Sequence, residues 1–408
     1  MAALVAAMTV EAQIRLPAQL PSLPLPAVQQ NLGALNALNA NAGTLQTLSD
    51  VRRQAISRLI RANHRLIEAD PDGEPIVSGE ILAGAIDEET PSRWAALGFT
   101  VEHTETVSGV NFRLVVLRVP EHLSTRKALR ELREADPQGS YDYNHIYLAS
   151  GVDLTPVPVA ESIAPHEPSA SPRIRVGLVD AGLDDTHPAF RGSTIRSWGC
   201  AGKRLPSAHG TAVASLLVAH GAAELHAADV YCGKPTGGSV NLIVAALGWM
   251  AEEQVAVINI SLVGPKNVLL EHIVGALVAR GHLVVAAVGN DGPAAPPLYP
   301  AAYAGVVGVT AVDAHRRVLI EAERGPQVMF AAQGADLKAA DLAHGYAAVR
   351  GTSFAAPTVA ALLAPMVEAP DRQRSFDALD TLAKQAVHLG SAGRDLTYGY
   401  GLVGADSH

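Results

Sequence analysis

Three short blocks in the sequence carry residues that together could attack an acyl carbon. Asp180 lies in Val-Asp-Ala-Gly, His209 begins His-Gly-Thr-Ala-Val-Ala, and Ser353 lies in Gly-Thr-Ser-Phe-Ala-Ala-Pro. A carboxylate can orient an imidazole, the imidazole can act as a general base, and a serine hydroxyl can act as the nucleophile. Most aspartates, histidines and serines in a chain have no catalytic role. The local structure around each of the three residues therefore decides whether it is a catalytic candidate.

Each of the three residues is predicted at an edge of regular structure. Ser353 follows Gly351 and begins an apolar helix, whose unsatisfied N–H groups and dipole could stabilise an oxyanion. His209 begins a second helix, which favours the neutral imidazole that a base requires. Asp180 ends an apolar strand. The structural alternatives are a capping serine, a half-exposed histidine and an acid that caps a turn. Weaker candidates fall inside the next loop: Asp184, Asp185 and His187.

A fourth block, Ala-Ala-Val-Gly-Asn-Asp-Gly, places Asn290 directly after an apolar strand. Its side-chain amide could donate a hydrogen bond to a developing oxyanion. The alternative is a turn-forming asparagine, which is what Asn-Asp-Gly alone usually indicates.

Strands and helices alternate from Ile174 onward. Ile174–Val179 is an unbroken apolar run, typical of a strand buried on both faces. Further strands are predicted at 226–231, 255–262, 283–288 and 306–312, and helices at 209–219, 240–253, 267–280 and 353–367. This alternation predicts an α/β fold with a mostly parallel sheet between two layers of helices. Reactive groups in such folds gather at the carboxyl ends of strands, where Asp180 lies.

The N-terminal region begins with two segments of different character. Residues 1–44 hold a short apolar run and a Pro-rich tract, which we interpret as a secretory signal remnant followed by a disordered segment. A secretory signal normally begins with a positively charged region, but the first basic residue here is Arg15. The alternative is therefore an ordinary disordered N-terminus. Residues 45–74 are expected to form one amphipathic helix that continues to Glu68.

Residues 75–150 show the order strand, helix, strand, strand, helix, strand. That order predicts a small α+β domain of the ferredoxin-like type. Residues 151–172 carry five prolines and are expected to form an exposed linker before a catalytic domain at 173–408.

Composition excludes several classes of function. The chain has 408 residues, of which 48% are hydrophobic, and a formal net charge of −9. It therefore has no global basic field for nucleic acid, and no apolar run is long enough to insert stably into a membrane. The two cysteines, Cys200 and Cys232, are expected to form a disulfide if the protein is exported, and to be buried thiols otherwise.

The four blocks together resemble the subtilisin-like serine proteases, the subtilases of peptidase family S8. The order acid, base, nucleophile is that of subtilisin and differs from chymotrypsin and the α/β-hydrolases. The resemblance covers about 174–404 and implies a secreted endopeptidase with the subtilisin-like three-layer fold. Asp180 would orient the base His209, and Ser353 would be the nucleophile. Asn290 and the backbone N–H of Ser353 would bind the oxyanion.

The resemblance also implies where the substrate binds. Residues 259–265 would pair with the substrate backbone and wall the main specificity pocket, and residues 298–303 would lie behind it. The residues assigned to substrate binding are Ser261, Leu262, Val263, Gly264, Val288 and Gly289. The alternative for 261–265 is an ordinary strand-to-loop turn.

Several positions depart from the usual family pattern. Ala181 replaces a serine or threonine, which removes one hydroxyl near the acid. Val263 and Val288 replace smaller residues, and we expect them to narrow the pocket toward small or medium apolar side chains. The family's usual calcium loops have no match, so neither a metal nor another cofactor is predicted.

Subtilases are commonly made with a ferredoxin-like propeptide, and residues 75–150 have that element order. The expected partners are polypeptide substrates and the chain's own N-terminal domain, which would act as an intramolecular inhibitor or chaperone until the 151–172 linker is cleaved. A permanent accessory domain is the alternative. Two other functions compete: a catalytically silent peptide-binding pseudo-protease, and an acyl hydrolase of another fold, for which no Gly-x-Ser-x-Gly block is present.

Overall fold

A computed structural model describes residues 42–84, 90–107, 110–150, 152–156 and 174–404. The predictions for 1–41, 151 and 157–172 therefore lie outside the described residues. Within the predicted linker, Val152–Pro156 is wrongly predicted as irregular chain, because it forms the strand β6, whose backbone pairs with β17 (Tyr346–Arg350). Contacts divide the chain into two units, Met1–Thr44 and Leu45–His408, and the following description concerns the second.

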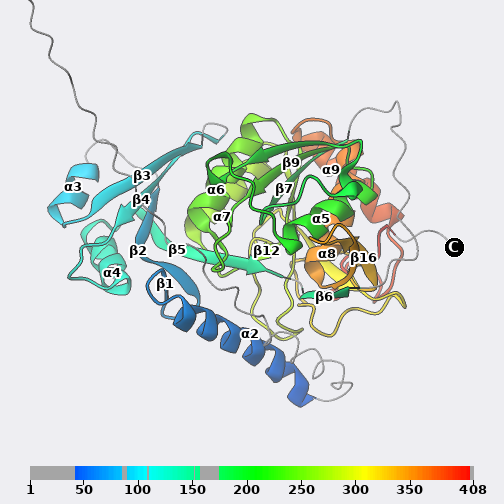
Figure 1. Cartoon of the computed structure of the whole chain (residues 1–408), viewed down its shortest axis with the longest axis horizontal. Coiled ribbons are helices and arrows are strands. Elements are labelled where there is room, and N and C mark those ends of the chain that lie inside the picture. The colour runs from blue at the N-terminus through cyan, green and yellow to red at the C-terminus, as the bar shows by residue number, and fades with distance from the viewer. Residues whose placement is uncertain (1–41, 85–89, 108–109, 151, 157–173, 405–408) are drawn as a thin grey trace, which may run out of the picture. The chain divides into compact units, whose positions relative to one another are not determined.

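The predicted catalytic domain is built on a seven-stranded parallel sheet with the order β15-β14-β13-β11-β7-β9-β8. Figure 1 labels β7 and β9 of this sheet. The strands are β7 (Arg175–Asp180), β8 (Thr194–Trp198), β9 (Glu224–Asp229), β11 (Val257–Ile260), β13 (Leu283–Ala287), β14 (Val307–Val312) and β15 (Val328–Gln333). Every residue of β11, β13 and β14 is buried, because helices cover both faces of the sheet. The prediction of a three-layer α/β fold is confirmed.

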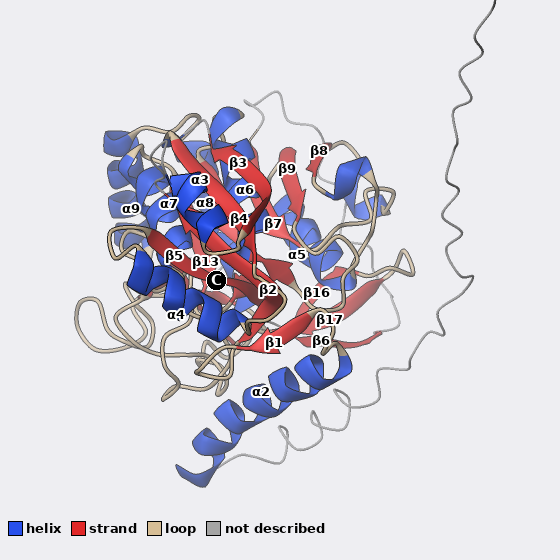
Figure 2. Cartoon of the chain, turned by 90° about the vertical axis from the view of Figure 1, so that its left-hand side faces the viewer, coloured by secondary structure: helices blue, strands red, loops and turns tan. Residues whose placement is uncertain are grey.

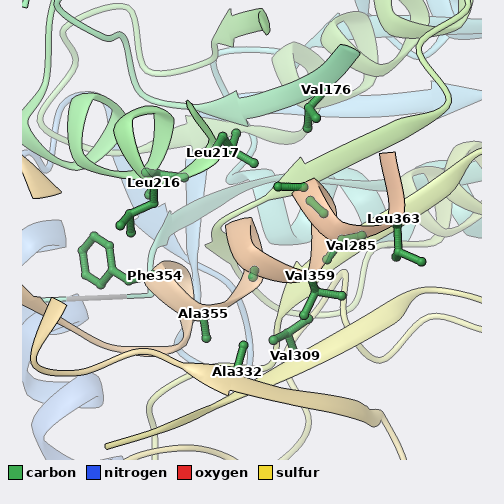
Figure 3. Packing of buried hydrophobic residues seen from close by; sticks show 14 of the residues in the cluster. Val176, Leu216, Leu217, Val285, Val309, Ala332, Phe354, Ala355, Val359 and Leu363 are labelled. Atoms are coloured by element: carbon green, nitrogen blue, oxygen red, sulfur yellow. The ribbon is translucent and has the colours of Figure 1, made fainter. Parts of the chain in front are cut away.

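Each face of this sheet has its own hydrophobic core. On one face the sheet packs against α5 (Ala208–Ala219), α8 (Thr352–Leu363) and α9 (Arg372–Gln385). Figure 3 shows α8 inside this core, where Phe354, Ala355 and Val359 meet residues of the sheet and α5. On the other face it packs against α6 (Val240–Glu252) and α7 (Val268–Ala279). Burial of α8 is nearly complete, so the backbone at its N-terminus is held rigidly.

The predicted ferredoxin-like domain is present (Figure 2). Its antiparallel sheet has the order β5-β2-β4-β3, and two helices cover one face. The elements are β2 (Pro75–Gly84), α3 (Thr90–Ala96), β3 (Thr100–Val107), β4 (Phe112–Arg118), α4 (Thr125–Ala135) and β5 (Ser140–Ala149). Alternation along β4 places Val115 and Leu117 on the helix side and Leu114 and Val116 on the opposite side.

That opposite side of the small sheet packs on the catalytic domain. Leu114 and Val116 belong to the same core as the buried residues of α6 and α7. The side chain of Asn267 at the start of α7 donates to the carbonyl of Tyr143 and contacts Nδ1 of His145 at 3.0 Å. The two domains therefore share a continuous apolar and polar interface.

The prediction of one helix continuing to Glu68 is wrong. The helix α2 covers Ala42–Ala62. Directly after its last residue, the side-chain amide of Asn63 donates to the carbonyl of Leu59. Ile67 lies in β1 (Ile67–Ala69), paired with Val77 of β2, and is buried there. Leu66 and Ile67 fit the helical spacing of apolar residues. In the structure, however, Leu66 is exposed and the buried side chain of Ile67 belongs to a strand of the sheet.

The predicted disulfide joins Cys200 to Cys232, with Cα atoms 5.0 Å apart. The bridge ties the segment after β8 to the segment after β9. Among the described residues, no helix is both long and apolar enough to span a membrane.

Candidate active site

The proposed acid and base are in direct contact. Asp180 is the last residue of β7 and is fully buried, and His209 is the second residue of α5. Nδ1 of His209 lies 2.8 Å from Oδ1 of Asp180, which also accepts the N–H of Ala181 at 2.7 Å. No described residue donates a hydrogen bond to Oδ2 of Asp180. This is consistent with Ala181, which lacks the hydroxyl that a serine or threonine would have at that position. The carboxylate can therefore hold the imidazole in the tautomer that leaves Nε2 as the base.

The weaker acid and base candidates do not join this pair. Asp184 contacts Nε2 of His344 at 2.9 Å, and Asp185 pairs with Arg204. Nε2 of His187 lies 2.9 Å from the carbonyl of Gly345. Loop contacts thus account for the polar groups of all three candidates.

The proposed nucleophile lies in the first turn of α8. Ser353 is fully buried, and the preceding Gly351 has a φ of 138°, which a residue with a side chain rarely adopts. The ring of the neighbouring Phe354 lies 5.4 Å from the ring of His209, so the nucleophile and the base come from adjacent helix starts. The hydroxyl of Ser353 donates to the carbonyl of Ser261 at 3.0 Å.

Asn290 is oriented by the same helix start. Its Oδ1 accepts the N–H of Thr352 at 3.1 Å, which turns Nδ2 toward the site. Nδ2 donates to the carbonyl oxygen of Ser150, and the N–H of Ser353 lies 3.5 Å from that oxygen. A carbonyl carbon is therefore presented beside the serine hydroxyl, with two N–H donors directed at its oxygen.

Ser150 occupies the site from within the chain. It follows β5, and its own Oγ lies 2.6 Å from Oγ of Ser353. Strand β5 pairs antiparallel with β12 (Leu262–Val263), with Ala149 opposite Leu262 and Leu148 opposite Val263. The N–H of Ser150 lies 3.5 Å from the carbonyl of Ser261. The chain's own N-terminal domain thus lies along the edge predicted to bind substrate.

The remaining predicted pocket residues lie around this edge. Gly264 exchanges backbone hydrogen bonds with Tyr299, which brings the 298–303 segment beside β12. Val263 and Val288 are buried, and the N–H of Gly289 donates to the hydroxyl of Thr352. The structure thus brings the two predicted pocket segments to the end of β13 that carries Asn290.

Sequence reasoning missed Ser150 and Thr352 as parts of the site. Thr352 orients Asn290 through its N–H and Gly289 through its hydroxyl. Its position directly before the proposed nucleophile was a usable signal. Ser150 gave no comparable signal, because only the docking of β5 brings it to the serine.

Comparisons with known proteins place the chain in a family. The model of the subtilase family matches residues 171–401, more than half of the chain. Minor extracellular protease Epr of Bacillus subtilis (strain 168) is 30% identical over 243 residues, which are 56% of this chain and 37% of Epr. Subtilisin Savinase of Lederbergia lenta is 32% identical over 247 residues, which are 57% of this chain and 90% of Savinase.

One solved structure is similar over more of the chain. Fervidolysin from Fervidobacterium pennivorans, described as a keratinolytic enzyme related to subtilisin, superimposes with a TM-score of 0.67 at 19% identity. The similarity covers 82% of this chain and 61% of fervidolysin, and it shows that the fold is shared. With the family match over 171–401, the chain belongs to the subtilase family of serine-type endopeptidases, peptidase family S8.

Proposed function

We propose that the chain is the precursor of a secreted serine endopeptidase that uses Asp180, His209 and Ser353 as a catalytic triad. The observation that carries the proposal is the carbonyl of Ser150. Its oxygen accepts a hydrogen bond from Nδ2 of Asn290 and faces the N–H of Ser353, while the two serine hydroxyls lie 2.6 Å apart. A carbonyl held by two N–H donors beside a serine hydroxyl supports the proposal. The attack also requires the Ser353 hydroxyl, which donates to the carbonyl of Ser261, to turn toward Nε2 of His209.

The chemistry follows from these positions. Oγ of Ser353 attacks the carbonyl carbon, and its proton passes to Nε2 of His209, whose Nδ1–H donates to Asp180. Asn290 and the N–H of Ser353 stabilise the negative oxygen of the tetrahedral intermediate. His209 then gives the proton to the leaving amine, and the C–N bond breaks to leave an acyl-enzyme. A water molecule, activated by His209, releases the acyl group in the same way.

The first bond to be cut is Ser150–Gly151 of the chain itself. Its carbonyl group belongs to Ser150, and the preceding strand β5 is held by β12. The strand β6 (Val152–Pro156) continues on the other side and pairs with β17 (Tyr346–Arg350), which ends just before Gly351. The bond lies at the N-terminal edge of the linker predicted to be cleaved. An intramolecular substrate has a high effective concentration, so the first cut needs no second molecule.

The N-terminal domain acts as an inhibitor after the cut. The interface of Leu114, Val116 and the Asn267 hydrogen bonds does not depend on the Ser150–Gly151 bond. The product carboxylate of Ser150 therefore stays in the site until the domain unfolds or is digested. Removal of the domain opens the groove to polypeptide substrates.

The disulfide supports export, and so does the similarity to Epr, an extracellular protease. Fractionation of the producing cells, with the intact disulfide detected by mass spectrometry, tests this part. Enzyme retained in the cytosol with free thiols would contradict it.

One experiment tests the catalytic assignment. The full chain and a Ser353→Ala variant are purified, and each is analysed by intact mass and by labelling with a fluorophosphonate. We expect the wild-type chain to yield a fragment that begins at Gly151 and becomes labelled, and the variant to stay uncut and unlabelled. Labelling of both proteins, or of neither after removal of the N-terminal domain, would contradict the proposal.

A further inference from the structure

The carboxyl groups of Asp291 and Glu323 lie near Asn290, and none of the proposed catalytic steps uses them. Asp291 directly follows Asn290. The backbone N–H of Glu323 donates to the carbonyl of Gly289 at 3.1 Å, and its Oε2 accepts the N–H of Leu298 at 3.1 Å. A Cβ atom placed on Gly289 would lie 2.6 Å from Oε1 of Glu323. The Glu323 carboxyl group therefore lies against Gly289, which is assigned to substrate binding, and Leu298, which begins the segment predicted behind the specificity pocket.

The acid pair of Asp291 and Glu323 lacks a complete set of partners. The Glu323 side chain is fully buried, and no described residue donates to its Oε1. Burial and the nearby Asp291 raise the pKa of Glu323 to about 9. Burial also raises the pKa of Asp291, to about 6, against the opposing effect of Arg52. A buried acceptor of this kind costs free energy unless a donor or a cation faces it.

The guanidinium of Arg52, which lies outside the catalytic domain, pairs with one of these two carboxyl groups. Nε of Arg52 in α2 lies 3.2 Å from Oδ2 of Asp291, and the guanidinium also binds Glu74 at 2.7 Å. The hydroxyl of Ser49, one turn earlier, donates to the carbonyl of Asp291 at 3.2 Å. Arg52 also interacts electrostatically with Glu323. The N-terminal region thus brings its own positive side chain to the acid pair.

The strand in the groove supplies no such charge. The carbonyl of Ser150 faces Asn290, so Ser150 stands where the acyl-side residue of a substrate would stand. Its side chain is one short hydroxymethyl group, directed at Oγ of Ser353. Once the bond after Ser150 is cut and residues 1–150 leave, Arg52 and Glu74 leave with them. The acid pair stays behind, next to the carbonyl-binding site.

We propose that Asp291 and Glu323 form a cation-binding subsite of the specificity pocket, which Arg52 occupies in the precursor. In the mature enzyme an arginine or lysine on the acyl side of the scissile bond takes its place. This inference rests on the proposed endopeptidase function. It competes with the preference for small or medium apolar side chains expected from Val263 and Val288, which stays a prediction. Peptides that differ at the acyl-side residue distinguish the two.

The first experiment compares matched peptides on the mature enzyme. The peptides differ only at the acyl-side residue, which is arginine, lysine, alanine, leucine or citrulline, the neutral isostere of arginine. We expect kcat/KM for arginine to exceed that for citrulline by at least about tenfold. Glu323→Gln and Asp291→Asn should each reduce this ratio. The half-buried Glu271 on α7 pairs with Lys266 and does not contact the acid pair, so Glu271→Gln should preserve the ratio. Cleavage with equal rates for arginine and citrulline would overturn the subsite while leaving the endopeptidase function in place.

The second experiment needs no catalysis. Benzamidine, a small amidinium probe, is added to the full-length Ser353→Ala precursor with and without Arg52→Ala, and the melting temperature is measured. We expect benzamidine to stabilise the Arg52→Ala protein but not the protein that keeps Arg52, because the cation subsite is vacated only in the former. Adding Glu323→Gln should remove the stabilisation. Equal shifts with and without Arg52, or no shift in either, would overturn the proposal even if no peptide were cleaved.

Discussion

Nδ1 of His209 lies 2.8 Å from Oδ1 of Asp180, and both side chains are buried at adjoining edges of β7 and α5. The contact fixes which imidazole nitrogen carries the proton. We predict that Asp180→Asn keeps the fold but lowers the rate of the Ser150–Gly151 cut and of peptide hydrolysis about 10⁴-fold, because the amide favours the wrong tautomer. Single-turnover cleavage of the precursor measures the first rate. A loss smaller than tenfold would show that Asp180 does not orient the base.

Asn290 should contribute to the transition state and little to ground-state binding. Its Nδ2 is directed at the carbonyl oxygen, where negative charge develops, and its Oδ1 is held by the N–H of Thr352. Asn290→Ala should lower kcat by about 10²–10³, the loss known for the side-chain oxyanion donor of subtilisin, with KM nearly unchanged. Steady-state kinetics on one peptide separate the two constants. A rise in KM at unchanged kcat would assign Asn290 to substrate binding instead.

Sequence patterns predicted the parts of this site that depend on local structure. Asp180, His209 and Ser353 each stand at the edge of a strand or helix whose apolar run is visible in the sequence. The place of Ser150 depends on the docking of one domain on another, which no local pattern encodes. The same is true of Arg52, which meets Asp291 across 239 positions of sequence. The sequence pattern predicts a helix at Ile67 because helical spacing is judged from neighbouring residues only. Its strand partner Val77 lies ten residues further along the chain.

The glycine after the base is predicted to be essential for packing. A Cβ atom on Gly210 would lie 2.2 Å from the carbonyl oxygen of Ala181 and 2.5 Å from that of Gly182, in the turn that follows Asp180. Gly210→Ala must therefore move either α5 or this turn. We expect at least a tenfold loss of activity, and a loss of about 1–3 kcal/mol in stability, as for other overpacked sites.

Gly275 on α7 provides the matched control. A Cβ atom there would meet nothing within 4 Å. Gly275→Ala should stabilise the protein by about 0.5–1 kcal/mol through helix propensity and leave activity unchanged. Melting temperatures and kcat/KM of the two variants test the pair. Equal behaviour of the two alanine variants would contradict the steric argument.

The contribution of His282 to stability should fall as the pH drops below the ordinary pKa of histidine. His282 is buried between α7 and β13, with Nδ1 2.8 Å from the carbonyl of Val255, and burial lowers its pKa below 6.5. Below pH 6.5 the unfolded chain binds a proton at this histidine that the folded chain does not yet bind. The contribution of His282 to the free energy of unfolding therefore decreases as the pH falls from 6.5 toward the lowered pKa, by at most about 1.4 kcal/mol per pH unit. The raised pKa values of Glu323 and Asp291 contribute with the opposite sign, so the His282 contribution is the difference between two variants that share both carboxyl groups. Burial lowers the pKa of His226 in β9 as well, so its contribution has the same sign as that of His282.

Urea unfolding of the Ser353→Ala precursor between pH 7.5 and pH 5 tests this sign, since that variant cannot digest itself. His282→Gln keeps a donor for the Val255 carbonyl but does not titrate at this position. The free energy of unfolding of the parent minus that of His282→Gln should therefore decrease as the pH falls. The exposed His122→Gln is the control and should leave the slope as it is in the parent. The burial of a neutral imidazole at 282 would be contradicted if this difference between the parent and His282→Gln stayed constant or grew as the pH fell.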